Sequence, residues 1–320
     1  MLSAPDLDRL RDRLHGIGYT VDPVLERLGT AGRRGLERNS TKPARDAVTA
    51  GGPDDALGSL IRLWILQDAV DQTAIEAALG AELTEALLAS GLVHVEWPSS
   101  GRGDRAASGA DRVPSGSPGK ADGGGDEDGA DRAVSGSDRR SPGSDRRSPG
   151  SDRRSPGSVP WAGASDRALL RAALSIRPYG AEAGPTGEVV AGWICHDLLP
   201  NLDGRNGRPH PSHVLGVSPA SSTLAQLTIR RPVGRALDLG TGCGVQSLHL
   251  AAHAKTIVAT DLNPRALELA RLTTRLSGVD ADLRLGSLYE PVADESFDLI
   301  VSNPPFVISP PGERLVYREG

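Results

Sequence analysis

A glycine-rich stretch in the second half of the chain has the composition of a loop that binds a nucleotide-like ligand. Residues 235–244 read RALDLGTGCG, so a short apolar run reaches the acid Asp238 and then turns on alternating glycines. A helical run from Val245 to His253 follows. Glycine adopts positive φ and lets the backbone approach a ligand closely. A loop of this kind at the carboxyl end of a strand is what a nucleotide-type group requires.

A second acid, Asp261, lies 17 residues after Gly244 and ends the apolar run TIVAT at residues 256–260. In doubly wound sheets, an acid at the end of the strand after the glycine loop binds the two ribose hydroxyls. The two features together predict an adenosyl cofactor. Taken alone, the glycine loop also fits nicotinamide or flavin enzymes, or a turn in which glycine serves only packing.

The sequence NPPF at residues 303–306 follows a further apolar run, FDLIVS at residues 297–302. Ligands of open α/β sheets bind beyond the carboxyl ends of the strands. We therefore expect Asp238, Asp261 and Asn303 to converge at one edge. The alternative interpretation of NPPF is an ordinary turn, because Asn and Pro favour turns at many strand ends.

The elements that must position these residues alternate between strand and helix. Asn263 as N-cap and Pro264 as first helical residue predict a helix that ends near Gly278. Residues 281–285 predict one more strand. The alternation predicts an α/β fold, a doubly wound Rossmann-like parallel sheet that is incomplete in this chain.

The glycine loop, the acid-ended second strand and NPPF together resemble class I S-adenosylmethionine-dependent methyltransferases of the NPPF/NPPY branch, over about Val233 to Phe306. That branch includes release-factor glutamine-N5, ribosomal RNA guanine-N2 and adenine-N6 methyltransferases. With its helical front half, the chain also resembles two-domain bacterial methyltransferases of the small-domain type. The resemblance implies S-adenosyl-L-methionine as cofactor and an N-methyltransferase.

The resemblance also implies a set of residues that bind the cofactor. Its members contact the methionine part, the ribose or the adenine: Asp238 near the methionine amino group, the backbone of Gly240, Thr241, Gly242 and Gly244 along the methionine part, Asp261 on the ribose, Leu262 beside the adenine, and Ser287 where the branch usually has an Asp or Asn.

In the same branch, the NPPF element aims the target nitrogen. The side-chain oxygen of Asn303 and the carbonyl of Pro304 accept the two hydrogens of an NH2 group, Pro305 helps to fix the backbone, and Phe306 stacks on a planar amide or base. Methyl transfer is an in-line displacement, so positioning contributes more than a general base. The resemblance implies a planar NH2 of RNA (ribosomal), of DNA or of a protein glutamine as substrate. The sequence does not choose among guanine, adenine and glutamine.

Other residues that are capable of chemistry have simpler interpretations. Cys243 in the loop has no clear histidine partner, which favours a small buried residue over a nucleophile. His210 and His213 lie beside prolines without a cluster of acids or cysteines, so we expect no metal site. A net charge of -5 does not favour a chain held to nucleic acid by phosphate contacts alone. The absence of a signal peptide and of a long apolar run predicts a cytoplasmic protein without a membrane span.

The chain divides into four predicted regions. Residues 1–97 are helical and winged-helix-like, with short helices followed by a strand at residues 92–97; residues 98–160 are a low-complexity, disordered insert with three SDRRSPG repeats; residues 161–232 hold a returning strand at 168–179 and a lead-in segment; residues 233–320 are the cofactor-binding domain. In the lead-in, Ser221 or Ser222 is expected to cap a helix.

The end of the chain suggests a second hypothesis about function. A complete sheet of the family has seven strands, and 14 residues follow Phe306, so the sequence predicts a C-terminally truncated domain. The alternative function is therefore a degenerate or truncated methyltransferase that acts as a nucleic-acid or protein binding module. The sequence leaves the oligomeric state open.

Overall fold

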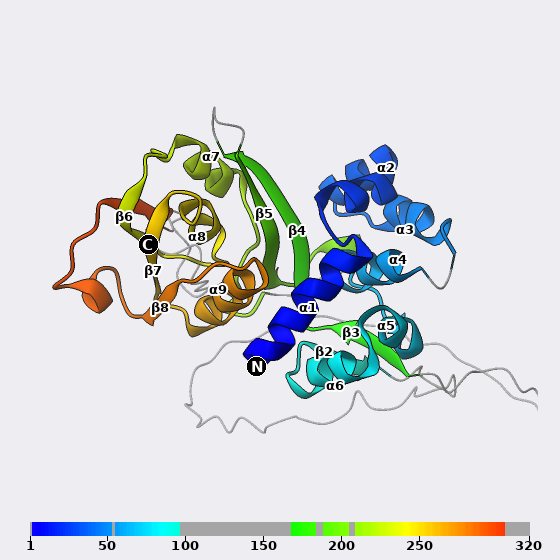
Figure 1. The fold of residues 1–320 in the computed structure, drawn as a ribbon. Coiled ribbons are helices and arrows are strands. Elements are labelled where there is room, and N and C mark those ends of the chain that lie inside the picture. Colours follow the sequence, from blue (N-terminus) through cyan, green and yellow to red (C-terminus); the bar gives the residue numbers. More distant parts are fainter. Residues whose placement is uncertain (1, 53–54, 97–167, 184–187, 205–208, 305–320) are drawn as a thin grey trace, which may run out of the picture. The chain divides into compact units, whose positions relative to one another are not determined.

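A computed structural model describes residues 2–52, 55–96, 168–183, 188–204 and 209–304 (Figure 1). The predicted insert at residues 98–160 lies outside this part of the chain. The N-terminal helices are amphipathic and short: α1 (Ala4–Ile17), α2 (Val21–Glu37), α3 (Lys42–Thr49), α4 (Ala56–Leu60), the π-helical turn η1 (Ile61–Ile65), α5 (Gln72–Leu79) and α6 (Ala81–Ala89). Gly18 ends α1 with φ 75°, and Asp71 caps α5 by accepting from the Thr73 N–H at 2.9 Å.

A small antiparallel sheet is formed by strands before α5, after α6 and beyond residue 167. It has the order β1-β3-β2, with β1 at Val70–Asp71, β2 at Val93–Glu96 and β3 at Leu169–Ala172. β3 pairs with β2 over its whole length, with Val93 opposite Ala172. The predicted strand at residues 168–179 is divided, because the chain leaves this sheet after Ala172 and continues into another strand. The domain boundaries themselves stay predictions.

A long antiparallel hairpin joins the two halves of the chain. β4 (Leu174–Ala183) pairs with β5 (Glu188–Asp197), and Leu174 lies opposite Asp197. β4 contacts α2 and η1, whereas β5 contacts α8 and α9, so the hairpin lies between the N-terminal helices and the parallel sheet (Figure 1). The hairpin was not predicted as a pair, because the sequence shows neither strand's partner.

The C-terminal part of the described chain is a parallel sheet of order β8-β7-β6-β9 with helices between the strands. Its elements are α7 (Pro219–Leu227), β6 (Val233–Leu239), α8 (Val245–Leu250), β7 (Ala254–Asp261), α9 (Pro264–Leu276), β8 (Asp282–Leu285) and β9 (Leu299–Ser302), with short 3-10 turns η3 (Leu202–Gly204) and η4 (Glu290–Val292). The predicted Rossmann-like α/β fold is confirmed. The cap of α7 is Ser218, whose side chain accepts from the Ser221 N–H, so the prediction of Ser221 or Ser222 as cap was wrong.

One buried apolar cluster extends from the N-terminal helices to the helices of the parallel sheet. It includes Leu10, Trp64 and Trp193 together with Cys243 and Leu269. β5 is further fixed to α9 by side chains, because the Cys195 N–H donates to Thr273 Oγ1 at 2.9 Å and the Trp193 N–H to Ser277 Oγ at 3.0 Å. Among the described residues, no helix has both the length and the apolar character that a bilayer crossing requires.

Candidate functional site

The glycine loop lies at the carboxyl end of β6 and is fixed to the neighbouring strand. The N–H groups of Gly240 and Thr241 both donate to the Thr260 carbonyl at 2.9 Å. Gly240 and Gly242 have φ of 73° and 55°, and a Cβ added at either position meets no atom within 4 Å. These two glycines therefore present bare backbone to open space, as a ligand-binding loop requires.

Gly244 differs from the other two loop glycines. Its φ is 83°, and an added Cβ would lie 3.2 Å from the Cα of Ala270 in α9. Gly244 also begins α8, and its N–H donates to the Thr241 carbonyl at 2.9 Å. This glycine allows α8 and α9 to pack closely, so its surroundings are those of a packing position.

Asp238 is buried beneath the loop. Its Oδ2 accepts from Thr241 Oγ1 at 2.7 Å and from Ser247 Oγ at 2.8 Å, so the carboxyl connects the end of β6 to the loop and to α8. Burial raises the pKa of Asp238 to about 6, although both hydroxyl bonds act to lower it. The nearby Asp261 raises it further. Burial thus makes the ionised form of Asp238 less favourable, a feature typical of functional carboxyls.

Asp261 ends β7 and is half-buried. Its Oδ2 accepts from the Gly242 N–H at 2.9 Å, and its Oδ1 accepts from the Asn263 N–H at 2.8 Å. Burial raises the pKa of Asp261, and the bonds from Asn263 and Gly242 lower it. The structure therefore brings the two predicted carboxyls to one loop, Asp238 through Thr241 and Asp261 through Gly242.

Asn303 follows β9 at the same edge of the sheet. Leu239 is in register with Thr260 on one side and with Ser302 on the other, so the next residues, Gly240, Asp261 and Asn303, form one row across three strands. Asn303 is half-buried and Pro304 is exposed. The predicted Pro305 and Phe306 lie outside the described residues.

Exposed apolar side chains gather around the end of β7 and β8. Leu262 follows Asp261, and Leu285 is paired with Asp261 in the sheet. Leu262, Leu285, Leu288 and Tyr289 are all more than half exposed. Ser287, predicted to meet the adenine, lies in this turn and its carbonyl accepts from the Glu290 N–H at 3.0 Å. A flat apolar group would find several contacts here.

Two features of the site were not predicted. Ser247 donates to Asp238 from the first turn of α8, and its position nine residues along the chain gave no signal for this contact. The Asn263 side chain caps α9 as predicted, with Oδ1 accepting from the Arg265 N–H at 3.0 Å. Its Nδ2 also donates to the Ser212 carbonyl at 2.9 Å, which joins the lead-in segment to the site.

The other side chains considered for chemistry are Cys243 and the possible metal ligands. Cys243 is buried, and burial raises the pKa of its thiol to about 12, which keeps it protonated and a poor nucleophile. In the part of the chain that the structure describes, no group of three or more His, Cys, Asp or Glu side chains is placed to bind a metal ion.

Comparison with known proteins identifies the region that carries this geometry. Residues 216–314 match the family described as "Methyltransferase small domain". This segment is a methyltransferase small domain. Residues 16–106 match a second family, described as "Domain of unknown function (DUF7059)". That match begins at the end of α1 and includes β2.

The curated relatives of the methyltransferase small domain act on translation components, by their names. The chain is 34% identical over 125 residues to the release factor glutamine methyltransferase of Aquifex aeolicus, a match that covers 38% of this chain and 44% of that protein. It is 33% identical over 134 residues to the ribosomal RNA small subunit methyltransferase C of Salmonella arizonae, covering 41% and 34%. The chain thus spans less than half the length of these relatives.

Among solved structures, the chain is similar to a 16S rRNA N2 methyltransferase of T. thermophilus in complex with AdoMet and guanosine. The identity is 21%, the match covers 47% of this chain and 41% of that one, and the TM-score is 0.32. A likeness at this level adds nothing to the family match.

S-adenosylmethionine is the cofactor of such a domain, and the residues at the edge of the sheet fit it. Gly240 and Gly242 leave space above their backbone, Asp261 is a half-buried carboxyl beside them, and Leu262 offers an apolar surface. Anionic groups suit the positive charges of the methionine part, and a carboxylate accepts from hydroxyl groups.

Proposed function

We propose that the chain is an S-adenosylmethionine-dependent N-methyltransferase that modifies a planar NH2 group of ribosomal RNA or of a protein glutamine. The relatives named above carry these two kinds of substrate in their names. Neither of these two relatives has DNA as a substrate in its name. The proposal is carried by the row of Gly240, Asp261 and Asn303 at the carboxyl edge of the parallel sheet.

In this proposal, each member of the row has a separate task. The backbone at Gly240 and Gly242 lies along the methionine part, and Asp261 accepts from the ribose hydroxyls. Asp238 supports the glycine loop from the protein interior, because its bonds to Thr241 and Ser247 hold the loop and α8 in place. The cofactor, when bound, supplies an electrophilic methyl group on a sulfonium.

Asn303 aims the acceptor nitrogen. Its amide oxygen and the Pro304 carbonyl accept the two N–H hydrogens, which directs the nitrogen lone pair towards the cofactor. Asn303 directly follows the paired Ser302, and Ser302 Oγ donates to the Leu239 carbonyl at 3.0 Å. The end of β9 is therefore fixed to the start of the glycine loop. That attachment fixes the distance between the methyl donor and the acceptor nitrogen.

Cofactor binding is tested by isothermal titration of the chain with S-adenosylmethionine. We expect Asp261→Ala to lower the affinity by about 100-fold, because each hydrogen bond to a charged group contributes about 1.5–3 kcal/mol. Asp280→Ala, which removes an exposed carboxyl of the same region, is the matched control and should bind normally. Absence of binding by the folded wild-type chain would exclude the enzyme and favour the alternative of a binding module.

The substrate is tested with radiolabelled methyl donor and separated ribosomal RNA and protein fractions. Label in the RNA fraction assigns a base, and label in the protein fraction assigns a glutamine. Asn303→Ala should lower the rate of labelling by about 100-fold, the loss expected when a reacting group is misplaced by about 1 Å. The affinity for the cofactor should stay within twofold. Equal labelling by wild type and Asn303→Ala would overturn the role of Asn303.

A further inference from the structure

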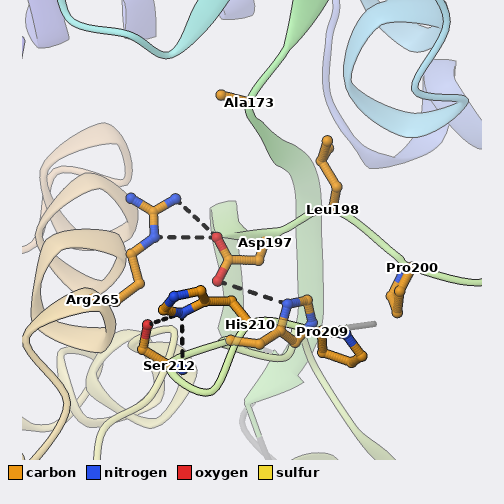
Figure 2. Close-up of a pocket in the computed structure, with 9 residues that line it drawn as sticks. Ala173, Asp197, Leu198, Pro200, Pro209, His210, Ser212 and Arg265 are labelled. Atoms are coloured by element: carbon orange, nitrogen blue, oxygen red, sulfur yellow. Dashed lines mark hydrogen bonds and ion pairs between the residues drawn. The ribbon is translucent and has the colours of Figure 1, made fainter. Parts of the chain in front are cut away.

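A cavity of about 490 Å³ lies at the beginning of α9, beside the candidate site (Figure 2). Its polar walls come from three elements that are distant in sequence: Asp197 at the end of β5, Ser212 and His213 in the lead-in segment, and Arg265 in the first turn of α9. Figure 2 shows Arg265 pointing at the Asp197 carboxyl from the α9 side. The carboxyl is therefore a junction between these elements.

Asp197 makes contacts of both charge and backbone type. Its Oδ1 accepts from Arg265 Nη2 at 2.8 Å and from Nε at 3.1 Å, and its Oδ2 accepts from the Val214 N–H at 2.9 Å. The Asp197 N–H in turn donates to the Val214 carbonyl at 3.1 Å. His213 Nδ1 lies 3.9 Å from Oδ2. The backbone N–H and carbonyl of Val214 thus both bond to Asp197, and an ion pair with Arg265 connects Asp197 to α9.

Asn263 holds the other end of the same short segment. Its Nδ2 donates to the Ser212 carbonyl, while its own N–H donates to Asp261 Oδ1 at 2.8 Å. Asn263 is buried. Asn263 therefore links Ser212 to Asp261, the carboxyl that we assign to the ribose.

The segment continues into α7, which is bonded to α8 after the glycine loop. After Val214 it passes Leu215 and Val217, which are exposed, and enters α7. There the Ser221 carbonyl accepts from Gln246 Nε2 at 2.7 Å. Gln246 lies two residues after Gly244. The residues 212–221 are thus attached at one end next to Asp261 and at the other next to the glycine loop.

We propose that Asp197 is a positioning residue of the cofactor site: it fixes the segment 212–217 so that Leu215 and Val217 form a wall over the bound S-adenosylmethionine. This inference rests on the proposed function. The ion pair with Arg265 sets where Asp197 lies relative to α9, and the two bonds to Val214 transmit that position to the segment. Without the Asp197 carboxyl, the segment keeps its contacts at Ser212 and Ser221 and the backbone bond from the Asp197 N–H to the Val214 carbonyl, and it loses the bond from the Val214 N–H.

The test compares Asp197→Ala and Asp197→Asn with Glu268→Ala in the full chain. Glu268 is the other partner of Arg265, with Oε2 at 3.1 Å from Nη1, and it lies on α9, outside the segment. Glu268→Ala is the matched control, since it removes a carboxyl from the same arginine. Asparagine at 197 keeps an acceptor for the Val214 N–H and loses the charge.

We expect Asp197→Ala to weaken S-adenosylmethionine binding by about tenfold, a factor that corresponds to about 1.4 kcal/mol. Asp197→Asn should weaken it by about threefold, and Glu268→Ala by less than twofold. Hydrogen exchange should show loss of protection at the Val214 amide in Asp197→Ala alone. In methyl transfer, KM for the cofactor should rise while kcat changes less than twofold, which a general loss of stability would not produce.

Two results would overturn the inference. Equal losses in Asp197→Ala and Glu268→Ala would show that only the stability of α9 matters. Normal affinity in Asp197→Ala despite a rapidly exchanging Val214 would show that the segment does not touch the cofactor. If Asp197→Ala does not fold, Asp197→Asn decides by affinity: a loss no larger than that of Glu268→Ala would overturn the inference. Failure of the wild-type chain to bind S-adenosylmethionine is a separate result, which removes the proposed function and this inference together.

Discussion

The hairpin β4–β5 and the carboxyl edge of the parallel sheet use polar side chains in opposite ways. In the hairpin, buried polar groups pair with backbone from distant parts of the chain: Tyr19 Oη donates to the Ile176 carbonyl at 2.7 Å, and Trp193 Nε1 donates to the Tyr19 carbonyl at 2.8 Å. At the edge, Asp238 and Asp261 bond to the loop beside them, and Gly240 and Gly242 face open space.

This difference separates the frame of the molecule from its binding surface. A buried polar group with a fixed partner holds two segments in one arrangement, and its loss leaves the partner unsatisfied. A half-buried carboxyl beside bare backbone has capacity left for a ligand. Apart from Asp197 at the end of β5, changes in the hairpin should therefore affect stability, whereas changes at the edge should affect cofactor binding.

The largest effect is expected from Trp193→Ala in the hairpin. Trp193 is buried, packs edge-on against His15 and donates to Tyr19, so its removal leaves a cavity and an unpaired carbonyl. The free energy of unfolding should fall by about 3–5 kcal/mol, measured by urea denaturation. Val189→Ala on the same strand is the control, because Val189 is exposed and should change it little. A similar loss in both variants would contradict the assignment of Trp193 to the frame.

The next effect concerns the pH dependence of stability at Asp238. Its pKa is about 6 in the folded chain and 3.8 when solvated, so the folded state binds more protons between these values. Stability is therefore lost as pH rises through this window, by roughly 3 kcal/mol in total at about 1.4 kcal/mol per pKa unit. Asp238→Asn should remove this loss.

Urea denaturation of wild type and Asp238→Asn between pH 4 and pH 8 measures the difference directly. Burial lowers the pKa of His196 and His249 to about 4, so these groups act in the opposite direction and add stability as pH rises. Their contribution cancels in the comparison of the two variants. A constant difference across the whole range would disprove the raised pKa of Asp238.

A smaller effect distinguishes two glycines of one loop. Gly242→Ala and Gly244→Ala both place a side chain at positive φ, which costs about 1–2 kcal/mol. Gly244→Ala should destabilise more, since its Cβ would press on Ala270, while Gly242→Ala should weaken cofactor binding more. Thermal unfolding and titration of both variants give the two rankings. The same order in both measurements would remove the distinction between a packing glycine and a ligand-facing one.

The smallest effect is expected from Tyr19→Phe. The change removes the hydroxyl that donates to the Ile176 carbonyl and leaves the ring in place. Unfolding should become easier by about 1 kcal/mol, the usual net value of one hydrogen bond, with unchanged affinity for S-adenosylmethionine. Weaker binding by the folded variant would show that this hydrogen bond supports the cofactor site as well as the frame.

Local sequence patterns were sufficient to predict the parallel-sheet region. The apolar runs that end in Asp238, Asp261 and Asn303 became β6, β7 and β9, and Asn263 and Asp71 cap their helices. These features depend on neighbouring residues. The spacing of apolar residues sets which side chains are buried, a short polar side chain accepts from the first N–H groups of a helix, and glycine permits positive φ. The roles of the individual site residues stay predictions.

Contacts between distant residues were decided by the tertiary structure. The pairing of β4 with β5, the ion pair of Asp197 with Arg265 and the bond of Ser247 to Asp238 join residues whose types carry no signal for one another. Gly242 and Gly244 look equivalent in the sequence, and only the position of Ala270 separates them. The sequence by itself determined which chemistry gathers at the end of the parallel strands. The packing of β5 and the segment 212–221 against α9 and α8 decided how that edge is held, because such packing depends on the meeting of surfaces that no local pattern encodes.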